Sequence, residues 1–175
     1  MNSSYVIKPA FSDDVDILQQ LSIVTFSDTY ADYNTPADMQ LYIAQHFNRE
    51  LLFSELNSEE NFFFLAMFDS EPAGYIKLRT NHQLSQLNSK KSIELERIYV
   101  VKHFQGTGLG NRLIQYGVKF ARGKEYETMW LGVWTKNEKA IGFYKKCGFK
   151  IFGEQKFILG KDEQIDWLMK RELAD

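Results

Sequence analysis

The segment 93–122 constrains the fold of this chain more than any other part of its sequence. Its first eight residues (IELERIYV) have the composition of a β-strand, and its last fifteen or so have the apolar spacing of an amphipathic helix. Between the two lies the turn 105–110 (QGTGLG), in which every second residue is glycine. Glycine lets a phosphate approach the backbone without meeting a Cβ atom, and a helix N-terminus adds outward N–H groups and a partial positive charge. The segment therefore predicts an anion-binding site suited to a pyrophosphate.

Two common nucleotide-binding motifs do not fit this turn. The P-loop requires Lys followed by Ser or Thr after its last glycine, whereas Gly110 is followed by Asn111 and Arg112. The dinucleotide fingerprint GxGxxG requires a third glycine where Asn111 stands. Taken alone, the turn could also be a tight turn that only needs positive φ angles, so its function depends on the rest of the chain.

The remaining sequence alternates between helix-like and strand-like patterns without a linker or internal repeat. This predicts one α/β (α+β) domain over residues 1–175. Helix starts are indicated by Ser12 and its two following acids, by Thr35 before a proline, by Asn48 and by Asn137, and Gly148 indicates a helix end. Strands are expected at 5–8, 62–68, 73–79, 93–100, 128–134, 149–159 and 164–171, helices at 12–25, from 36, from about 49, after the glycine turn and at 138–146, and loops at 26–30 and 81–91.

The composition excludes several classes of function. The net charge of −2 gives no basic field for nucleic acid, and no apolar run approaches the ~20 residues of a membrane span. Cys147 is the only cysteine, so a reducing, cytoplasmic location is expected, and the three histidines have no metal-ligand spacing. The sequence does not fix the oligomeric state, and a homodimer is compatible with it.

Two blocks of the sequence resemble the signatures of one enzyme family. The run Gln105-x-x-Gly108-x-Gly110, directly after the strand 95–100, resembles the acetyl-CoA-binding motif of the GCN5-related N-acetyltransferases (GNAT). The segment 134–149 (WTKNEKAIGFYKKCGF) resembles the second signature of that family. A narrower resemblance to bacterial polyamine acetyltransferases of the family covers residues 21–30, 73–77, 95–100 and 130–134.

The resemblance implies a GNAT fold, in which a mixed, mostly antiparallel sheet flanked by helices splays between its fourth and fifth strands. Acetyl-CoA would lie in that opening as co-substrate, without a metal. The pyrophosphate would bind the turn, the pantetheine arm would bind the preceding strand as an added strand does, and a main-chain N–H near Ile98 or Tyr99 would polarise the thioester carbonyl. The cofactor-binding residues would be Ile98, Tyr99, Val100, Gln105, Gly106, Thr107, Gly108, Leu109, Gly110, Asn111, Asn137, Tyr144 and Lys146.

The resemblance also implies direct transfer of the acetyl group to a primary amine. Tyr144 would protonate the departing thiolate, and Glu96 could take the proton of the amine, which is about one part in a thousand neutral at pH 7. Asp28 and Asp32 could attract a cationic substrate, with a polyamine-like small amine favoured. A covalent route through Cys147 is not expected, because no histidine is placed to activate it. Acetylation of a peptide or protein, and acetyl-CoA binding by a regulatory module without turnover, remain alternatives.

Overall fold

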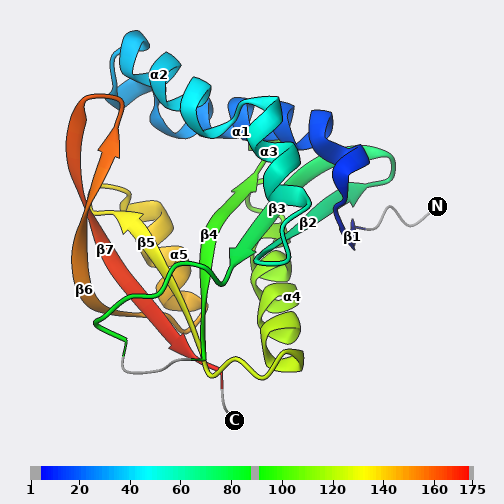
Figure 1. Cartoon of the computed structure of the whole chain (residues 1–175), viewed down its shortest axis with the longest axis vertical. Helices are drawn as coiled ribbons and strands as arrows, with labels where there is room; N and C mark the ends of the chain where they lie inside the picture. Colours follow the sequence, from blue (N-terminus) through cyan, green and yellow to red (C-terminus); the bar gives the residue numbers. More distant parts are fainter. Residues whose placement is uncertain (1–4, 88–90, 174–175) are drawn as a thin grey trace.

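One seven-stranded mixed sheet forms the centre of the molecule, with helices on both faces (Figure 1). The computed structural model describes residues 5–87 and 91–173. The strand order is β1-β2-β3-β4-β5-β7-β6, and every neighbouring pair is antiparallel except the parallel pair β4 and β5. The strands are β1 Tyr5–Pro9, β2 Asn61–Phe68, β3 Glu71–Arg79, β4 Ser92–Val100, β5 Thr128–Trp134, β6 Lys150–Leu159 and β7 Asp162–Glu172.

The helices fall into two groups that cover opposite faces of the sheet. Side chains of α1 pack on Phe63, Leu65 and Tyr75, whereas those of α4 pack on the alternate positions Ile76 and Leu78. This alternation follows from the two-residue period of a strand. The helices are α1 Val15–Tyr30, α2 Pro36–His46, α3 Arg49–Leu56, α4 Leu109–Gly123 and α5 Glu138–Lys146, with short 3₁₀ turns η1 Ser12–Asp14, η2 Ala31–Tyr33 and η3 Lys102–Phe104.

The helix starts expected at Thr35, Asn48 and Asn137 are confirmed by side-chain caps, whereas Ser12 caps no helix, because it lies within η1 and α1 begins at Val15. The Thr35 hydroxyl accepts the N–H of Asp38 at 3.2 Å, and the Asn48 side chain accepts the N–H of Leu51 at 2.9 Å. Gly148 follows α5 with a φ of 88°, as expected for a glycine after a helix end.

The predicted end of the first helix near residue 25 is wrong. Helix α1 continues to Tyr30, so residues 26–30 are helical rather than a loop. The Phe26 ring is 1% exposed and stacks on Tyr42 of α2 at 4.4 Å, with Phe47 edge-on at 5.4 Å. These contacts come from distant parts of the chain, and tertiary packing of this kind supplies most of the stability of a helix in a protein.

Strands β4 and β5 separate after three residue pairs. Ser92, Ile93 and Glu94 pair with residues 128–130, and beyond this point β4 pairs only with β3, while β5 pairs with β7. The predicted separation of the fourth and fifth strands is therefore confirmed. Figure 1 shows the two strands diverging from a common lower end.

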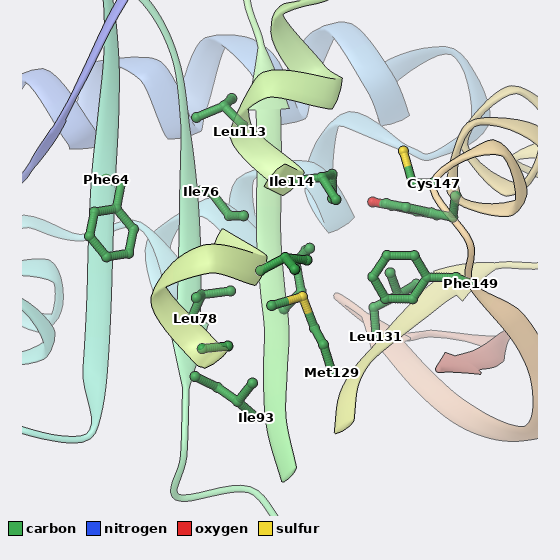
Figure 2. Close-up of a cluster of buried hydrophobic side chains, with 14 of the residues drawn as sticks. Phe64, Ile76, Leu78, Ile93, Leu113, Ile114, Met129, Leu131, Cys147 and Phe149 are labelled. Carbon is green, nitrogen blue, oxygen red and sulfur yellow. The ribbon is translucent and has the colours of Figure 1, made fainter. Parts of the chain in front are cut away.

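The main hydrophobic core holds the two diverging halves together below this opening. Figure 2 shows Leu113 and Ile114 of α4 beside Ile76 and Leu78 of β3, with Met129 and Leu131 of β5 toward α5. Gly117 permits this contact, because a Cβ atom at this position would lie 3.1 Å from Ile76 Cδ1. The opening is thus built on a tightly packed base.

The loop expected at 81–91 contains no helix or strand in its described part, and residues 88–90 lie outside the described residues. Leu87 is 9% exposed and packs with Trp130 and Leu168 on the sheet. No helix among residues 5–87 and 91–173 is long and apolar enough to cross a membrane.

Candidate active site

The upper half of β4 presents one strand edge to the opening. Ile98, Tyr99 and Val100 pair with β3 on their other side, opposite Ile76, Tyr75 and Gly74. Main-chain groups on the edge that faces β5 therefore have no strand partner, as an extended, amide-containing ligand would require. This is the place that the sequence predicts for the pantetheine arm.

A β-bulge at Glu96 lies where the opening begins. Leu95 stands opposite Leu78 and Arg97 opposite Lys77, so Glu96 is the extra residue of β4. The bulge turns the charged side chains of Glu96 and Arg97 toward Lys77, on the face covered by α1 and α3.

The glycine turn above the opening has the backbone of an anion site. Gly106 and Gly108 have φ angles of 81° and 85°, and no atom lies within 4 Å of a Cβ built at either position. The first intrahelical bond of α4 runs from the N–H of Arg112 to the carbonyl of Gly108, at 3.1 Å. The preceding amides of α4 have no acceptor within the helix and point out of its N-terminus.

Gly110 has a different role from the two other glycines of the turn. A Cβ atom at Gly110 would lie 3.2 Å from Cζ of Phe143, so this glycine allows α5 to pack closely on the first turn of α4. It positions the turn, and a phosphate contact at Gly110 would have to use its backbone N–H.

Side chains brace the turn from both sides. Gln105 Nε2 donates to the carbonyl of Val100 at 3.1 Å, and Gln105 Oε1 accepts from Lys139 Nζ at 2.8 Å. Thr107 Oγ1 donates to the carbonyl of Phe104 at 2.7 Å and accepts from the Tyr5 hydroxyl at 2.8 Å. Sequence reasoning placed Gln105 among the residues of this turn but missed Tyr5 and Lys139, which come from a distant strand and a distant helix.

Helix α5 carries the second group of predicted residues across the opening. Asn137 caps it, its Oδ1 accepting the N–H of Ala140 at 3.1 Å, so a ligand contact would use the Asn137 Nδ2 group. Tyr144 is buried, and burial together with Cys147 raises the pKa of its phenol above the ordinary value, which keeps it protonated. Cys147 is itself buried with a raised pKa, as expected for a packing residue, and Lys146 is exposed.

The Glu96 carboxylate belongs to a buried ion-pair network. It pairs with Lys77, Arg79 and Arg97, and Glu55 of α3 pairs with Lys77 at 2.8 Å and with Arg97 at 3.2 Å. Burial alone would raise the pKa of Glu96, but the charges of Arg97, Lys77 and Arg79 outweigh it and lower this pKa to about 2.

A carboxylate with so low a pKa is a weak proton acceptor at neutral pH. The low pKa is an argument against the predicted role of Glu96 as the group that takes the proton of the amine, and that role stays a prediction. Its three cationic neighbours come from β3 and from β4 itself, and they leave the carboxylate as a structural anion within the bulge.

Aromatic rings from both sides of the opening meet on the face covered by α1 and α2. Tyr30 and Tyr42 pack in one cluster with Tyr99 of β4, and the Tyr30 ring lies 6.1 Å from Trp134 of β5. Burial raises the pKa of Tyr30, and Asp166 and Tyr144 add to this shift, so the Tyr30 phenol lies within electrostatic range of both.

The predicted acids Asp28 and Asp32 flank Tyr30 in the chain but are exposed. The buried acid of this region is Asp166 on β7, which is 7% exposed, and burial raises its pKa to about 6. Sequence reasoning missed it. Its one signal is an acid within a short, otherwise apolar stretch of the strand (IDWLM), which also fits an exposed strand position.

No group of three or more His, Cys, Asp or Glu side chains suited to a metal occurs in the part of the chain that the structure describes. The polar groups described beside the opening include backbone N–H groups, phenols and the Asp166 carboxylate. They suit a phosphate-bearing thioester and an amine.

The mixed sheet separates between β4 and β5, beside a glycine turn and the N-terminus of α4. This combination is the one expected of an acyl-CoA-dependent transferase. A family model described as the Acetyltransferase (GNAT) family matches residues 22–149, and the chain belongs to this family. It is accordingly an N-acetyltransferase that uses acetyl-CoA.

Relatives and solved structures agree with this assignment. An uncharacterized N-acetyltransferase in the pepI 3′ region of Lactobacillus delbrueckii subsp. lactis is 37% identical over 154 residues, covering 88% of this chain and 89% of the relative. An N-alpha-acetyltransferase of Sulfurisphaera tokodaii is 28% identical, with coverage of 83% and 80%. The crystal structure of PaiA N-acetyltransferase from Thermoplasma acidophilum in complex with coenzyme A has a TM-score of 0.80 at 21% identity, covering 97% of this chain and 99% of that one.

Proposed function

We propose that this enzyme transfers the acetyl group of acetyl-CoA directly to the primary amine of a small, cationic, polyamine-like molecule. The observation that carries the transferase part is the unpaired edge of β4 beside the outward amides of the turn. The proposal keeps the CoA contacts expected from the sequence. A cytoplasmic location and a homodimer stay predictions.

The backbone of residues 106–111 would hold the pyrophosphate, because three features coincide there. Gly106 and Gly108 have backbone angles that other residues rarely adopt, no side chain covers them, and the dipole of α4 adds partial positive charge. Lys146 and Lys139 are exposed near the same helices and could meet further phosphate oxygens, although Lys139 is already bonded to Gln105.

Tyr144 would protonate the thiolate that leaves acetyl-CoA. Its raised pKa keeps the phenol protonated at neutral pH but also makes it a weaker acid, so the proton would move to sulfur as the C–S bond breaks and negative charge develops there. The buried Cys147 is held by Asn111, whose Oδ1 lies 3.7 Å from Sγ, and its raised pKa makes it a poor nucleophile. This supports direct transfer without an acetyl-cysteine.

Contacts between the β6–β7 hairpin and the segment that leads into α2 favour a small acceptor over an extended peptide. The tip of the β6–β7 hairpin is tied to the segment before and within α2. Asp38 Oδ1 accepts the N–H of Lys161 at 2.9 Å, and Asn34 Oδ1 accepts from Gln164 Nε2 at 3.0 Å. Leu159 of the same tip is buried against Phe26 and Met39. These contacts would obstruct an extended peptide that entered from this side.

Acetylation of a peptide or protein N-terminus is the second candidate. It is favoured by the likeness to the N-alpha-acetyltransferase of Sulfurisphaera tokodaii, which extends over 152 residues. The two candidates share the cofactor site and differ only in the acceptor, so a direct comparison of acceptors separates them.

The test is release of CoA thiol from acetyl-CoA in the presence of spermidine, spermine, simple alkylamines, and peptides with free N-termini or lysines. We expect release that depends on the polyamine, with initial-rate lines that intersect as a ternary complex requires. Release with peptides alone would overturn the small-amine proposal. Tight CoA binding without release for any acceptor would instead indicate a regulatory module.

A further inference from the structure

Asp166 is a buried carboxylate without a partner. It lies on β7, between β5 and β6, and is 7% exposed. Its Oδ1 has no hydrogen-bond partner, and none of the described cationic side chains forms an ion pair with it. Buried carboxylates are nearly always hydrogen-bonded or paired, because burial of an unpaired charge is costly. A positively charged group of a ligand would supply the partner that this carboxylate needs.

A glycine of the neighbouring strand makes room for this carboxylate. A Cβ atom at Gly132 of β5 would come 3.1 Å from Asp166 Oδ2 and 2.9 Å from Gln155 Nε2. A side chain at position 132 would therefore displace Asp166 or Gln155. Trp134 of β5 stands directly opposite Asp166 in the register, and its ring lies 6.1 Å from that of Tyr30, so this face of β5 and β7 is the one on which the aromatic rings of α1 pack.

A second unsatisfied oxygen lies on the same face of β7. Gln164 is 7% exposed, and its Nε2 donates to Asn34 Oδ1 and to Asp162 Oδ2. These two bonds fix the amide so that Oε1 remains without a donor. Positions 164 and 166 are two residues apart on one strand, roughly 7 Å along it. An alkylammonium group carries three N–H donors and one positive charge, so it could donate a hydrogen bond to each of these two oxygens.

We propose that Asp166 binds the protonated primary amine of the acceptor and takes its proton, with Gln164 as a second acceptor for a polyamine-like chain. This inference rests on the proposed function, and it prefers Asp166 to Glu96 as the proton acceptor because three cations hold the Glu96 carboxylate.

The charged and titratable groups around Asp166 are compatible with this role. Burial raises the pKa values of Tyr30 on α1 and Tyr42 on α2, and the charge of Asp166 adds to both shifts, so the two phenols stay neutral. Lys136, after β5, lies over the Trp134 ring at 5.8 Å. β6 presents the uncharged Gln155 on this face. Burial therefore sets the pKa of Asp166, at about 6, within the range useful to a general base near neutral pH.

The proton and electron balance of the reaction is complete with these groups. The ammonium gives one proton to Asp166, which passes it to solvent, and the free amine nitrogen forms the new N–C bond to the acetyl carbonyl carbon. The C–S bond breaks, its electron pair stays on sulfur, and the thiolate takes the proton of Tyr144. The second proton lost by the nitrogen restores the Tyr144 phenol.

The test is the pH profile of kcat/KM for spermidine in wild type and in Asp166→Asn, with Glu163→Gln on the same strand as the control for loss of a carboxylate. Wild type should rise through about pH 6 to a plateau, because ionised Asp166 pairs with the protonated amine. In Asp166→Asn, kcat/KM near pH 7 should fall about a hundredfold and rise steadily toward the pKa of the amine, without a plateau. CoA affinity and the Glu163→Gln profile should not change.

Two results would overturn the inference. One is an Asp166→Asn profile with the same plateau and rate as wild type. The other is an equal loss of CoA affinity and acceptor rate, which would indicate a structural role. A second variant, Gly132→Ala, adds only a methyl group beside Oδ2 and should raise KM for spermidine with CoA affinity unchanged; an unaltered KM would also contradict the proposal. Wild type that acetylates no amine at all would refute the proposed function instead.

Discussion

Glu96 and Asp166 lie on opposite sides of the opening between β4 and β5, and burial has opposite consequences for them. Glu96 on β4 is surrounded by Lys77, Arg79 and Arg97, and their charges lower its pKa to about 2 despite burial. Asp166 on β7 forms no ion pair with any of the described cationic side chains, and burial raises its pKa to about 6. A carboxylate stabilised by its own protein is a structural anion, whereas an unpaired one is available to a substrate.

The two halves of the site also differ in how they are built. In the proposed site, the cofactor would bind backbone groups of β4, the glycine turn and α4, which are adjacent in the sequence. The acceptor would bind side chains of α1, β5 and β7, which come together only in the fold. The following predictions test each half, from the largest expected change to the smallest.

Glu96→Gln should lower the free energy of unfolding by about 3 kcal/mol at pH 7, because it leaves Lys77 and Arg97 buried with less negative charge. The folded pKa of about 2 lies below the ordinary 4.5, so this stability is complete above about pH 4.5 and is lost as the pH falls toward 2. Urea unfolding at several pH values measures it. Glu163→Gln, which removes an exposed pair with Lys156, is the control and should change little. Equal effects of the two variants would refute the network's role.

Tyr144→Phe should lower kcat about a hundredfold, which corresponds to ~2.7 kcal/mol of transition-state stabilisation, because the thiolate must then leave unprotonated. CoA affinity, measured by calorimetry, should change little. Turnover equal to that of wild type would remove Tyr144 as the acid.

Asp166→Asn should change stability in the direction opposite to Glu96→Gln. The folded pKa of about 6 lies above the ordinary 3.8, so the native state loses stability as the pH rises from about 4 to about 6. Above pH 6 the destabilisation by the buried charge is complete. Removing the charge should therefore raise the free energy of unfolding by about 2 kcal/mol at pH 8, and by progressively less toward pH 4. Thermal or urea unfolding across this range measures the difference, and a loss of stability at pH 8 would contradict the unpaired state of Asp166.

Gly108→Asp should weaken CoA binding about tenfold, because it adds backbone strain at a φ of 85° and places a carboxylate beside the pyrophosphate site. Gly123→Asp, at the other end of α4 where a side chain meets no atom within 4 Å, is the matched control. Calorimetry with CoA gives both affinities. Equal affinity of the two variants would remove the turn from the cofactor site.

The sequence predicts the fold in places where the signal is local. The caps at Thr35, Asn48 and Asn137 and the glycine after α5 fix helix ends through bonds within four residues. The extension of α1 to Tyr30 could not be predicted in this way, because it depends on Phe26 packing against residues of α2 and the segment after it. The separation of β4 from β5 was expected only from the family resemblance.

The residues of the candidate site likewise differ in whether a local sequence pattern reveals them. The glycine turn is visible in the sequence because backbone conformation dictates glycine there. The role of Glu96 depends on Glu55 and Lys77, 41 and 19 positions earlier in the chain, which no local pattern connects to it. Asp166 is recognisable only once β7 is known to lie between β5 and β6, where an acid in a strand becomes buried.

The measurement that tests the account most directly is calorimetric titration of CoA, and of spermidine onto the CoA-bound enzyme, in wild type, Gly108→Asp and Asp166→Asn. The account predicts that Gly108→Asp weakens CoA binding and that Asp166→Asn leaves it unchanged. It predicts the reverse for spermidine once CoA is saturating. If either variant weakens both ligands to the same extent, the division of the site into a backbone-built cofactor half and a side-chain-built acceptor half is wrong.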